Sequence, residues 1–447
     1  MKSSLILLLL FSTTLTSKQE IQNLRILQTD ANSGSITNKY DYSSISGTIN
    51  ISTTGQTLEN TSSSSETIDK SVVYVSSCGS VSIKKSTLSK KSGDTSDIEN
   101  SEAYGVNAAI LVNGGSATLT ETTVTTAAKG ANAVFATNNG TITINGGSIT
   151  STGSSSARGL DATFGGKITA SGLTINTTGG SCASLATDRV EGTVSCTSCT
   201  LTTNGAGSPV IYSTGNITII DSTGIANGAQ MVIIEGKYSA TIKSSTLKCT
   251  GESNRENIDK CGVLIYQPHS EDADDGNGSF TAIDSTMEII STSSVYSTAP
   301  MFFVTNRKVN ITLSNVTFIY GSGIFLDIEA TDVWGITGSN GGDVNMTVIG
   351  QTIEGDIVVD DYSSLTLNLL SSSSFTGTIN AAKSSGTINI VVDASSKINL
   401  TGDSYITKLD NADSSGSNIN TGGYSYNDSN SSYLTVGVLT LLFLIFL

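Results

Sequence analysis

Four charged side chains are the candidates for chemistry in this chain, two carboxylates and two cations. Asp360 and Asp361 follow an apolar run, and Arg307 and Lys308 stand together further upstream. Two carboxylates that flank a glycosidic bond can act as acid and base, and such oxygens are also ligands for Ca²⁺. All four residues are candidates for catalysis, and the two aspartates are candidates for Ca²⁺. Exposed acidic corners explain the same residues more simply, so we favour a protein that is not an enzyme and has no cofactor.

The cysteines are the second set of reactive side chains. Six of them in a chain of this kind indicate an oxidising compartment and disulfides. We expect Cys249 and Cys261 to close the polar excursion between them. Cys196 and Cys199 form either a local bridge or a pairing with Cys182 one repeat earlier, because repeat residues and no strand-to-helix turn surround them. The candidate half-cystines are Cys78, Cys182, Cys196, Cys199, Cys249 and Cys261.

A repeated phrase must position these side chains. In its clearest form it reads Ile142-Thr-Ile144 followed by Ile149, with hydroxyl residues between the apolar ones. Such alternation is typical of a strand with one buried face, and β-branched Thr favours the extended backbone. Gly, Ser, Asn and Asp then mark tight corners. The phrase recurs at Ala117/Leu119/Val124, Ile168/Ala170/Ile175, Val194/Cys196/Leu201 and Ala240/Ile242/Leu247, and with Gly224 in the last place at Ile217/Ile219.

Each period also carries a third apolar piece, such as residues 109–111, 134–135, 183–185 and 210–212. Three short strands per period, joined by Gly and Asn corners, describe one coil of a parallel β-helix. A single coil cannot bury its apolar face, so neighbours must stack. We therefore predict an all-β fold, a single-stranded parallel β-helix (β-solenoid) of about 10–12 coils with three short strands in each, stacked about 4.8 Å apart.

Coils such as residues 140–150, Gly-Thr-Ile-Thr-Ile-Asn-Gly-Gly-Ser-Ile-Thr, resemble the right-handed parallel β-helix proteins of the pectin-lyase-like type over residues 46–402. That fold hosts lyases, hydrolases and surface adhesins. The resemblance implies, for a polygalacturonase, an Asp pair, a Gly-His-Gly and an Arg-x-Lys. This chain departs from that pattern, because its sole histidine, His269, lies in Gln-Pro-His-Ser and Arg307 is adjacent to Lys308.

Targeting signals and composition set the domain limits. We predict a signal peptide at 1–17, an N-terminal cap at 18–45, the β-helix at 46–402, a Ser/Gly/Asn-rich stalk at 403–432 and a glycosylphosphatidylinositol (GPI) attachment tail at 433–447. A tail-anchor helix is the alternative for the last segment. The net charge of −15 disfavours a nucleic-acid partner. The candidates for lipid attachment are Asn420, Gly422, Ser425 and Asn427.

Several surface features remain. Lys84, Lys85, Lys90 and Lys91 form a basic cluster, which we interpret as a solvated face. Loops at 89–104, 250–260 and 270–278 are the places for a binding surface. The outward threonines Thr118, Thr143, Thr169, Thr218 and Thr241 are expected to form a ladder. The candidates for N-glycosylation are Asn50, Asn60, Asn139, Asn176, Asn216, Asn277, Asn310, Asn315, Asn345 and Asn399.

From these observations we expect a secreted, glycosylated surface protein that is lipid-anchored to the outer face of the plasma membrane. Its expected work is adhesion, glycan binding or a structural coat, with extracellular glycans or proteins as partners. A polysaccharide lyase or glycoside hydrolase is the first alternative. An ice-binding solenoid, suggested by the threonine ladder, is the second.

Overall fold

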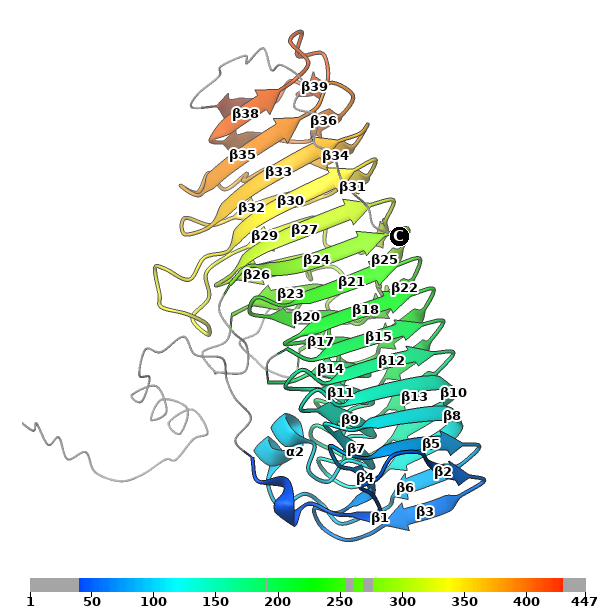
Figure 1. Ribbon diagram of the computed structural model, residues 1–447. Helices are drawn as coiled ribbons and strands as arrows, with labels where there is room; N and C mark the ends of the chain where they lie inside the picture. The colour runs from blue at the N-terminus through cyan, green and yellow to red at the C-terminus, as the bar shows by residue number, and fades with distance from the viewer. Residues whose placement is uncertain (1–39, 190, 254–259, 268–275, 429–447) are drawn as a thin grey trace, which may run out of the picture. The chain divides into compact units, whose positions relative to one another are not determined.

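The computed structural model describes residues 40–189, 191–253, 260–267 and 276–428. These residues form a β-solenoid in which strands far apart in sequence stack in chain order (Figure 1). Every pairing between the named strands is parallel, and the coils carry three strands each, which confirms the predicted architecture. We call the three stacks the first, second and third rows.

The first row holds the strand that begins each repeated phrase. It consists of β2 (Gln56–Glu59), β5 (Ser80–Lys84), β8 (Ser116–Thr126), β10 (Thr141–Ser151), β12 (Lys167–Ser171), β15 (Thr193–Thr197), β18 (Asn216–Ile220), β21 (Ser239–Lys243), β24 (Gly278–Ile283), β27 (Lys308–Ser314), β30 (Asp343–Ile349), β33 (Ser364–Leu370), β35 (Thr387–Val392) and β38 (Lys408–Asn411).

The second row follows after a corner, and β8 and β10 run through that corner into it. Its other strands are β3 (Ser62–Ser65), β6 (Thr87–Lys90), β13 (Thr174–Thr177), β16 (Thr200–Thr203), β19 (Thr223–Ala226), β22 (Thr246–Cys249), β25 (Thr286–Ile289) and β28 (Thr317–Ile319), then β31 (Thr352–Glu354), β34 (Ser374–Gly377), β36 (Lys397–Leu400) and β39 (Ile419–Asn420).

The third row is a twelve-stranded sheet that closes each coil. It consists of β1 (Gly47–Ile51), β4 (Ser71–Val75), β7 (Ile110–Asn113), β9 (Val134–Thr137), β11 (Leu160–Ala162), β14 (Leu185–Thr187), β17 (Ile211–Ser213), β20 (Val232–Glu235), β23 (Val263–Tyr266), β26 (Phe302–Thr305), β29 (Ile324–Ile328) and β32 (Asp356–Val359).

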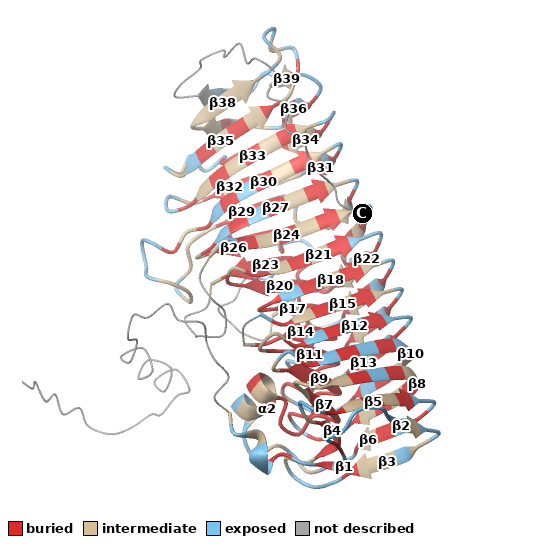
Figure 2. Ribbon diagram, in the orientation of Figure 1, coloured by how far each residue is buried: buried red, intermediate tan, exposed pale blue. Residues whose placement is uncertain are grey.

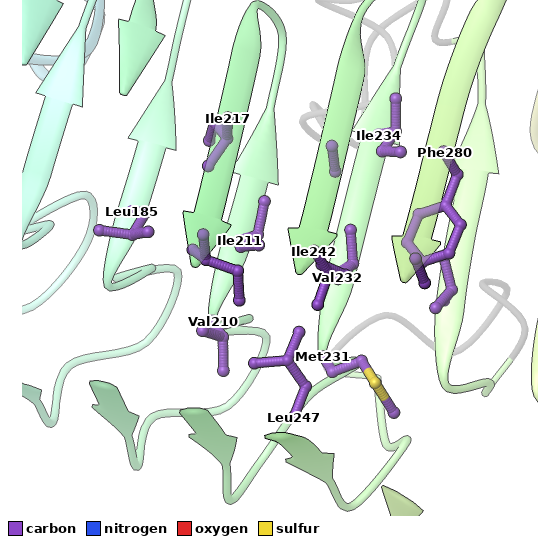
Figure 3. Close-up of a cluster of buried hydrophobic side chains, with 14 of the residues drawn as sticks. Leu185, Val210, Ile211, Ile217, Met231, Val232, Ile234, Ile242, Leu247 and Phe280 are labelled. Carbon is purple, nitrogen blue, oxygen red and sulfur yellow. The ribbon is translucent and has the colours of Figure 1, made fainter. Parts of the chain in front are cut away.

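One apolar core runs through the stacked coils. Along β12, Ile168 and Ala170 are buried while the residues on either side are exposed, as the period of two requires (Figure 2). Side chains of the three rows meet inside each coil, where Ile211, Ile217 and Leu247 belong to the same cluster (Figure 3). Because the pairs stay in register, each buried side chain packs on the equivalent residue one strand spacing away.

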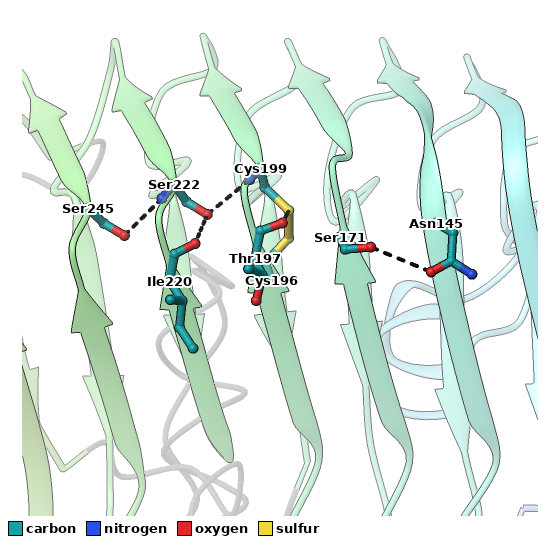
Figure 4. The surroundings of a disulfide bond; sticks show 8 residues. All are labelled: Asn145, Ser171, Cys196, Thr197, Cys199, Ile220, Ser222 and Ser245. Carbon is teal, nitrogen blue, oxygen red and sulfur yellow. Dashed lines mark hydrogen bonds between the residues drawn. A yellow bond between two sulfur atoms is a disulfide. The ribbon is translucent and has the colours of Figure 1, made fainter. Parts of the chain in front are cut away.

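The corner between the first and second rows is fastened by a column of buried hydroxyls. Ser245 Oγ accepts from the Ser222 backbone N–H at 3.0 Å, and Ser222 Oγ accepts from the Cys199 N–H at 3.0 Å (Figure 4). The residue before each of these serines adopts a left-handed conformation, with φ 48° at Asp221 and 47° at Ser244. Asp and Ser tolerate this left-handed conformation. The hydroxyls of Ser222 and Ser245 accept from backbone N–H groups that would otherwise be buried without a partner.

The disulfide among the described residues joins Cys196 and Cys199, the local alternative of the two that we considered (Figure 4). Cys249 and Cys182 are free, buried thiols, so the predicted Cys249–Cys261 bridge is wrong. Burial raises the pKa of Cys249 to about 12 and that of Cys182 to about 11, which keeps both thiols protonated. Cys78 is exposed and free.

The segment 89–104, predicted as a loop for a binding surface, instead packs against the outer face of the third row. It contains α2 (Ile98–Tyr104), capped by the Asp97 carboxylate and by Gly105 at φ 71°. Tyr104 stacks on Phe164 and on Tyr40, which precedes the 3-10 helix η2 (Tyr42–Ser44). The outward apolar residues of β7 and β9 lie beneath this segment. The rest of the predicted cap, residues 18–39, lies outside the described residues.

The prediction of a solvated basic cluster is wrong at one position. Lys84, Lys85 and Lys91 are exposed, but Lys90 is fully buried. Its Nζ donates to the carbonyl oxygens of Thr67 and Lys70, and burial lowers its pKa to about 8. Lys90 therefore fastens a corner and contributes nothing to a basic surface.

The coils continue past the expected end at Gly402. β38 pairs with β35, β39 with β36, and β37 (Ser404–Ile406) with β40 (Tyr426–Asp428). The segment predicted as a stalk is thus part of the solenoid as far as Asp428. Aspartates bind the corners of these last coils, since Asp403 accepts from the Ser425 N–H and Asp413 from the Ser415 N–H. Apolar content is low here because the polar corners take up most of each coil.

Candidate functional site

The four residues that the sequence singled out are each bonded to other groups. Asp360 accepts from the backbone N–H groups of Ala330 and Tyr362, at 2.8 and 3.1 Å. Arg307 lies at the same kind of corner two coils earlier, but its guanidinium donates to Gln267 at 2.6 Å and is nearly buried. The two groups therefore have different partners.

Asp361 and Lys308 also interact with different groups. Asp361 accepts from the backbone N–H and the hydroxyl of Ser385, which lowers its pKa. Lys308 pairs with Asp343 at 3.3 Å in the first row. Within the described ranges no group of three or more His, Cys, Asp or Glu side chains is arranged to hold a metal ion. His269, Asp274 and Asp275 lie outside the described residues.

The predicted threonine ladder is confirmed and is longer than expected. Ser195 fills the place between Thr169 and Thr218, and the column extends beyond Thr241 through the register of the first row. It consists of Thr118, Thr143, Thr169, Ser195, Thr218, Thr241, Thr281, Thr312 and Thr347. We call these nine residues the hydroxyl column.

The hydroxyl column faces solvent, and its groups are unoccupied. Each member is exposed or half-buried, between two buried core residues of its strand. None of the nine hydroxyls has a hydrogen-bond partner among the residues that the structure describes, in contrast to the bonded serines of the corner. A row of donor and acceptor groups about 4.8 Å apart therefore stands ready for a ligand with a matching repeat.

The surroundings of the hydroxyl column are polar and almost uncharged. Two residues earlier on each strand a parallel column begins with Ser116, Thr141 and Lys167, and it continues with Thr193, Asn216, Ser239, Ser279, Asn310 and Asn345. Within this column Asn345 donates to Asn310 at 3.2 Å. The second row carries ion-paired Lys248 and Glu288, at 2.7 Å, so charged side chains interrupt its outer face.

The ten sequon asparagines all reach solvent, as glycosylation needs. Some of their side-chain amides are used within the fold. The Nδ2 groups of Asn50, Asn315 and Asn399 donate to Gly47, Asp284 and Thr376.

A buried charged cluster on the outer face of the third row was missed by the sequence analysis. Asp161 is the central residue of β11, between the core residues Leu160 and Ala162, so its side chain points away from the core. Arg158 pairs with Asp161 at 2.8 Å and with Asp188 at 2.6 Å. Glu102 of α2 lies 3.8 Å from the same guanidinium. We call these four residues the Arg158 cluster.

Three carboxylates share one cation in the Arg158 cluster. Burial raises the pKa of Asp161 to about 7 and raises that of Glu102, and Asp161 Oδ1 is buried with no hydrogen-bond partner. The guanidinium also lies 5.4 Å from the Tyr212 ring, and the Tyr212 hydroxyl donates to Glu235. Because Arg158 and Asp161 are almost entirely inaccessible, the cluster holds α2 onto the solenoid and does not form an open catalytic site.

Comparisons of the chain with protein-family models, with curated proteins and with solved structures found no match. Among the described residues, no helix has the length and apolar character needed to cross a membrane.

Proposed function

We propose that the protein is a secreted, glycosylated, lipid-anchored β-helix of the pectin-lyase-like type that works in adhesion by binding extended glycans. The hydroxyl column carries this proposal. Its groups repeat at the strand spacing, a distance similar to the advance of one sugar ring along an extended polysaccharide. Hydroxyl and amide groups without net charge suit a neutral, hydroxylated partner, and a stacked rod presents them over many coils.

The lipid anchor is part of the same proposal. Attachment at Asn420 or Gly422 would remove β40, which pairs with β37. Attachment at Ser425 would remove it as well, since β40 begins at Tyr426. Asn427 is therefore the attachment residue that preserves most of the last coil. Mass spectrometry of the C-terminal peptide released by phospholipase treatment tests this assignment.

The glycan proposal is tested with the full chain secreted from eukaryotic cells. It is incubated with plant, microbial and animal polysaccharides, with and without Ca²⁺, and both retention and polysaccharide chain length are measured. We expect retention without shortening. Replacing Thr143, Thr169 and Thr218 together by Val keeps the strand shape but removes three hydroxyls. At roughly 1 kcal/mol for each hydrogen bond, this should weaken binding about 100-fold.

The matched control changes three equivalent threonines of the second row, Thr174, Thr200 and Thr223, to Val. These residues also face outward in register. Equal losses in both triple variants would contradict a specific role of the hydroxyl column. Shortened polysaccharides, lost on changing Asp360 and Asp361 to Ala, would instead establish an enzyme.

Ice binding is the second candidate, because the same unoccupied, regular hydroxyl column favours it. The two functions separate in one measurement. An ice-binding protein produces thermal hysteresis and reshapes growing ice crystals, and the Val variants of the first row would abolish both effects. A glycan-binding adhesin gives neither.

A further inference from the structure

The second row is interrupted between two consecutive coils. β28 pairs with β25 and β31 pairs with β34, but in the described part of the chain no pairing joins β28 to β31. The first and third rows stay paired in the same two coils, through β27–β30 and β29–β32. The interruption is therefore a local slot in an otherwise continuous wall.

One edge of the slot is the free side of β28. The Thr317 N–H donates to Ser285 of the preceding coil, at 2.8 Å. Backbone groups of a parallel strand alternate between its two neighbours. The N–H and C=O of Phe318 therefore point into the slot, where no strand receives them.

The opposite edge is the free side of β31. The Gln351 carbonyl accepts from Ser374, and the Gly355 N–H donates to Thr376, both on the β34 side at 2.9 Å. By the same alternation the N–H groups of Thr352 and Glu354 point into the slot. The Thr352 carbonyl accepts from the Gln351 Nε2 at 2.6 Å, so among the described residues only the two N–H groups of this edge have no partner.

Two long side chains cross the slot at its ends. Gln351 pairs with the backbone of Val316, since its Oε1 accepts from the Val316 N–H at 2.5 Å and its Nε2 donates to the Val316 carbonyl at 2.7 Å. The Tyr320 hydroxyl donates to the Glu354 carbonyl. In the neighbouring coils of the second row the backbones of adjacent strands bond directly to each other. Here a side chain stands between the two backbones, so β28 and β31 lie further apart than one strand spacing.

The slot opens to solvent as a groove of about 720 Å³. Phe318 is half-buried on the wall of the groove and Ile319 is 41% exposed. Met287, which pairs with Phe318 one coil earlier, is fully buried. Glu354 is the charged residue that lines the groove. The groove thus combines unpaired backbone groups, apolar surface and one carboxylate.

We propose that this slot binds an extended strand of a partner polypeptide, with alternating hydroxyl and apolar side chains and a basic residue opposite Glu354. The N–H and C=O of Phe318 on one edge, and the N–H groups of Thr352 and Glu354 on the other, match an extended peptide, which can bond to both edges at once. The apolar side chains of the strand cover Phe318 and Ile319. This site is separate from the hydroxyl column and does not depend on the glycan proposal.

The test uses the full chain and a synthetic heptapeptide, Lys-Thr-Ile-Thr-Ile-Thr-Lys, as the probe. Binding is followed by fluorescence anisotropy and located by hydrogen–deuterium exchange. We expect the peptide to slow exchange in the segments 316–320 and 351–355. A heptapeptide with Pro in the central position, which lacks one N–H, should bind at least 10-fold more weakly.

Two variants of the protein make the test specific. Thr352→Pro removes an N–H that faces the slot, and an edge position tolerates Pro; the matched control Thr352→Val keeps that N–H. Glu354→Lys, which reverses the charge that lines the groove, should weaken binding of the probe about 2- to 5-fold, as expected for an exposed ion pair.

Unchanged binding to Thr352→Pro, or protection confined to the last coils at 404–428, would overturn the proposal. Absence of probe binding would do the same, and polysaccharide retention by the same sample would show that the glycan proposal stands without it.

Discussion

The Arg158 cluster and the aspartate corners of the last coils use carboxylates in opposite ways within one architecture. In the cluster, burial raises the pKa of Asp161 to about 7 because three carboxylates share a single guanidinium. In the corners, N–H and O–H donors surround exposed carboxylates, and the pKa of Asp413 falls to about 2. The lesson is that the donors around a carboxylate, and not the stacked coil itself, decide how each region responds to acid.

The largest effect is expected from removing the cation of the cluster. Arg158→Met leaves Asp161 and Asp188 buried without a partner, which should destabilise the coils around β11 by about 3–5 kcal/mol at neutral pH. Hydrogen exchange of residues 98–104 and 160–188 measures this loss. Lys167→Met, at an exposed position of the first row, is the control for charge alone.

A combined variant sharpens that result. Changing Arg158 to Met together with Asp161 and Asp188 to Leu removes the guanidinium and its two most buried carboxylates and leaves Glu102, so most of the lost stability should return. If the triple variant is as unstable as Arg158→Met, the packing of the guanidinium stem, and not the unpaired charges, explains the loss.

The comparison predicts opposite pH dependence for the two regions. Asp161 binds its proton more tightly in the folded chain, so its contribution is present below pH 3.8 and is lost as the pH rises through about 7. Asp413 binds its proton less tightly when folded, so its contribution is present above pH 3.8 and is lost as the pH falls through about 2. Exchange rates corrected for intrinsic pH effects should show the last coils opening first in acid.

A smaller effect is expected at one corner. Asp393 accepts from the N–H groups of Ser371, Ser395 and Ser396, and these bonds lower its pKa. Asp393→Ala should cost about 1 kcal/mol, by analogy with the loss of a helix cap. Asp393→Asn keeps an acceptor without the titratable group, so it should retain most of the stability and remove the acid sensitivity. Thermal unfolding at pH 3 and pH 7 distinguishes the two variants.

The sequence predicted the rows well because apolar and hydroxyl residues alternate at a nearly fixed period. The strand β11 was not predicted, because Asp161 stands where other coils carry an apolar residue. The Arg158 cluster was missed for the same reason. The buried acid is recognisable only once the register places it over Arg158. The helix α2 was missed because its seven residues carry no helical period of apolar side chains, and only Asp97 and Gly105 mark its ends.

The interruption of the second row could not be predicted from the phrase either. Ile311/Leu313/Phe318 and Met346/Val348/Ile353 keep the same spacing on both sides of it. What differs is Tyr320, which occupies the register place of the core residue Ile289. Its hydroxyl bonds to Glu354 across the slot, so the aromatic ring acts as a spacer. The hydroxyl column, by contrast, was predicted from its threonines, and only Ser195 was needed to join them.

The same interruption has a mechanical consequence. In a stack where each coil contacts only its neighbours, tension applied at the C-terminal end is carried from coil to coil. Between β28 and β31 one of the three load-bearing seams is replaced by two side-chain bridges, from Gln351 and Tyr320. A tethered molecule under shear would therefore lose the coils from β30 onward as a block, while the coils before β30, with the hydroxyl column from Thr118 to Thr312, stay folded.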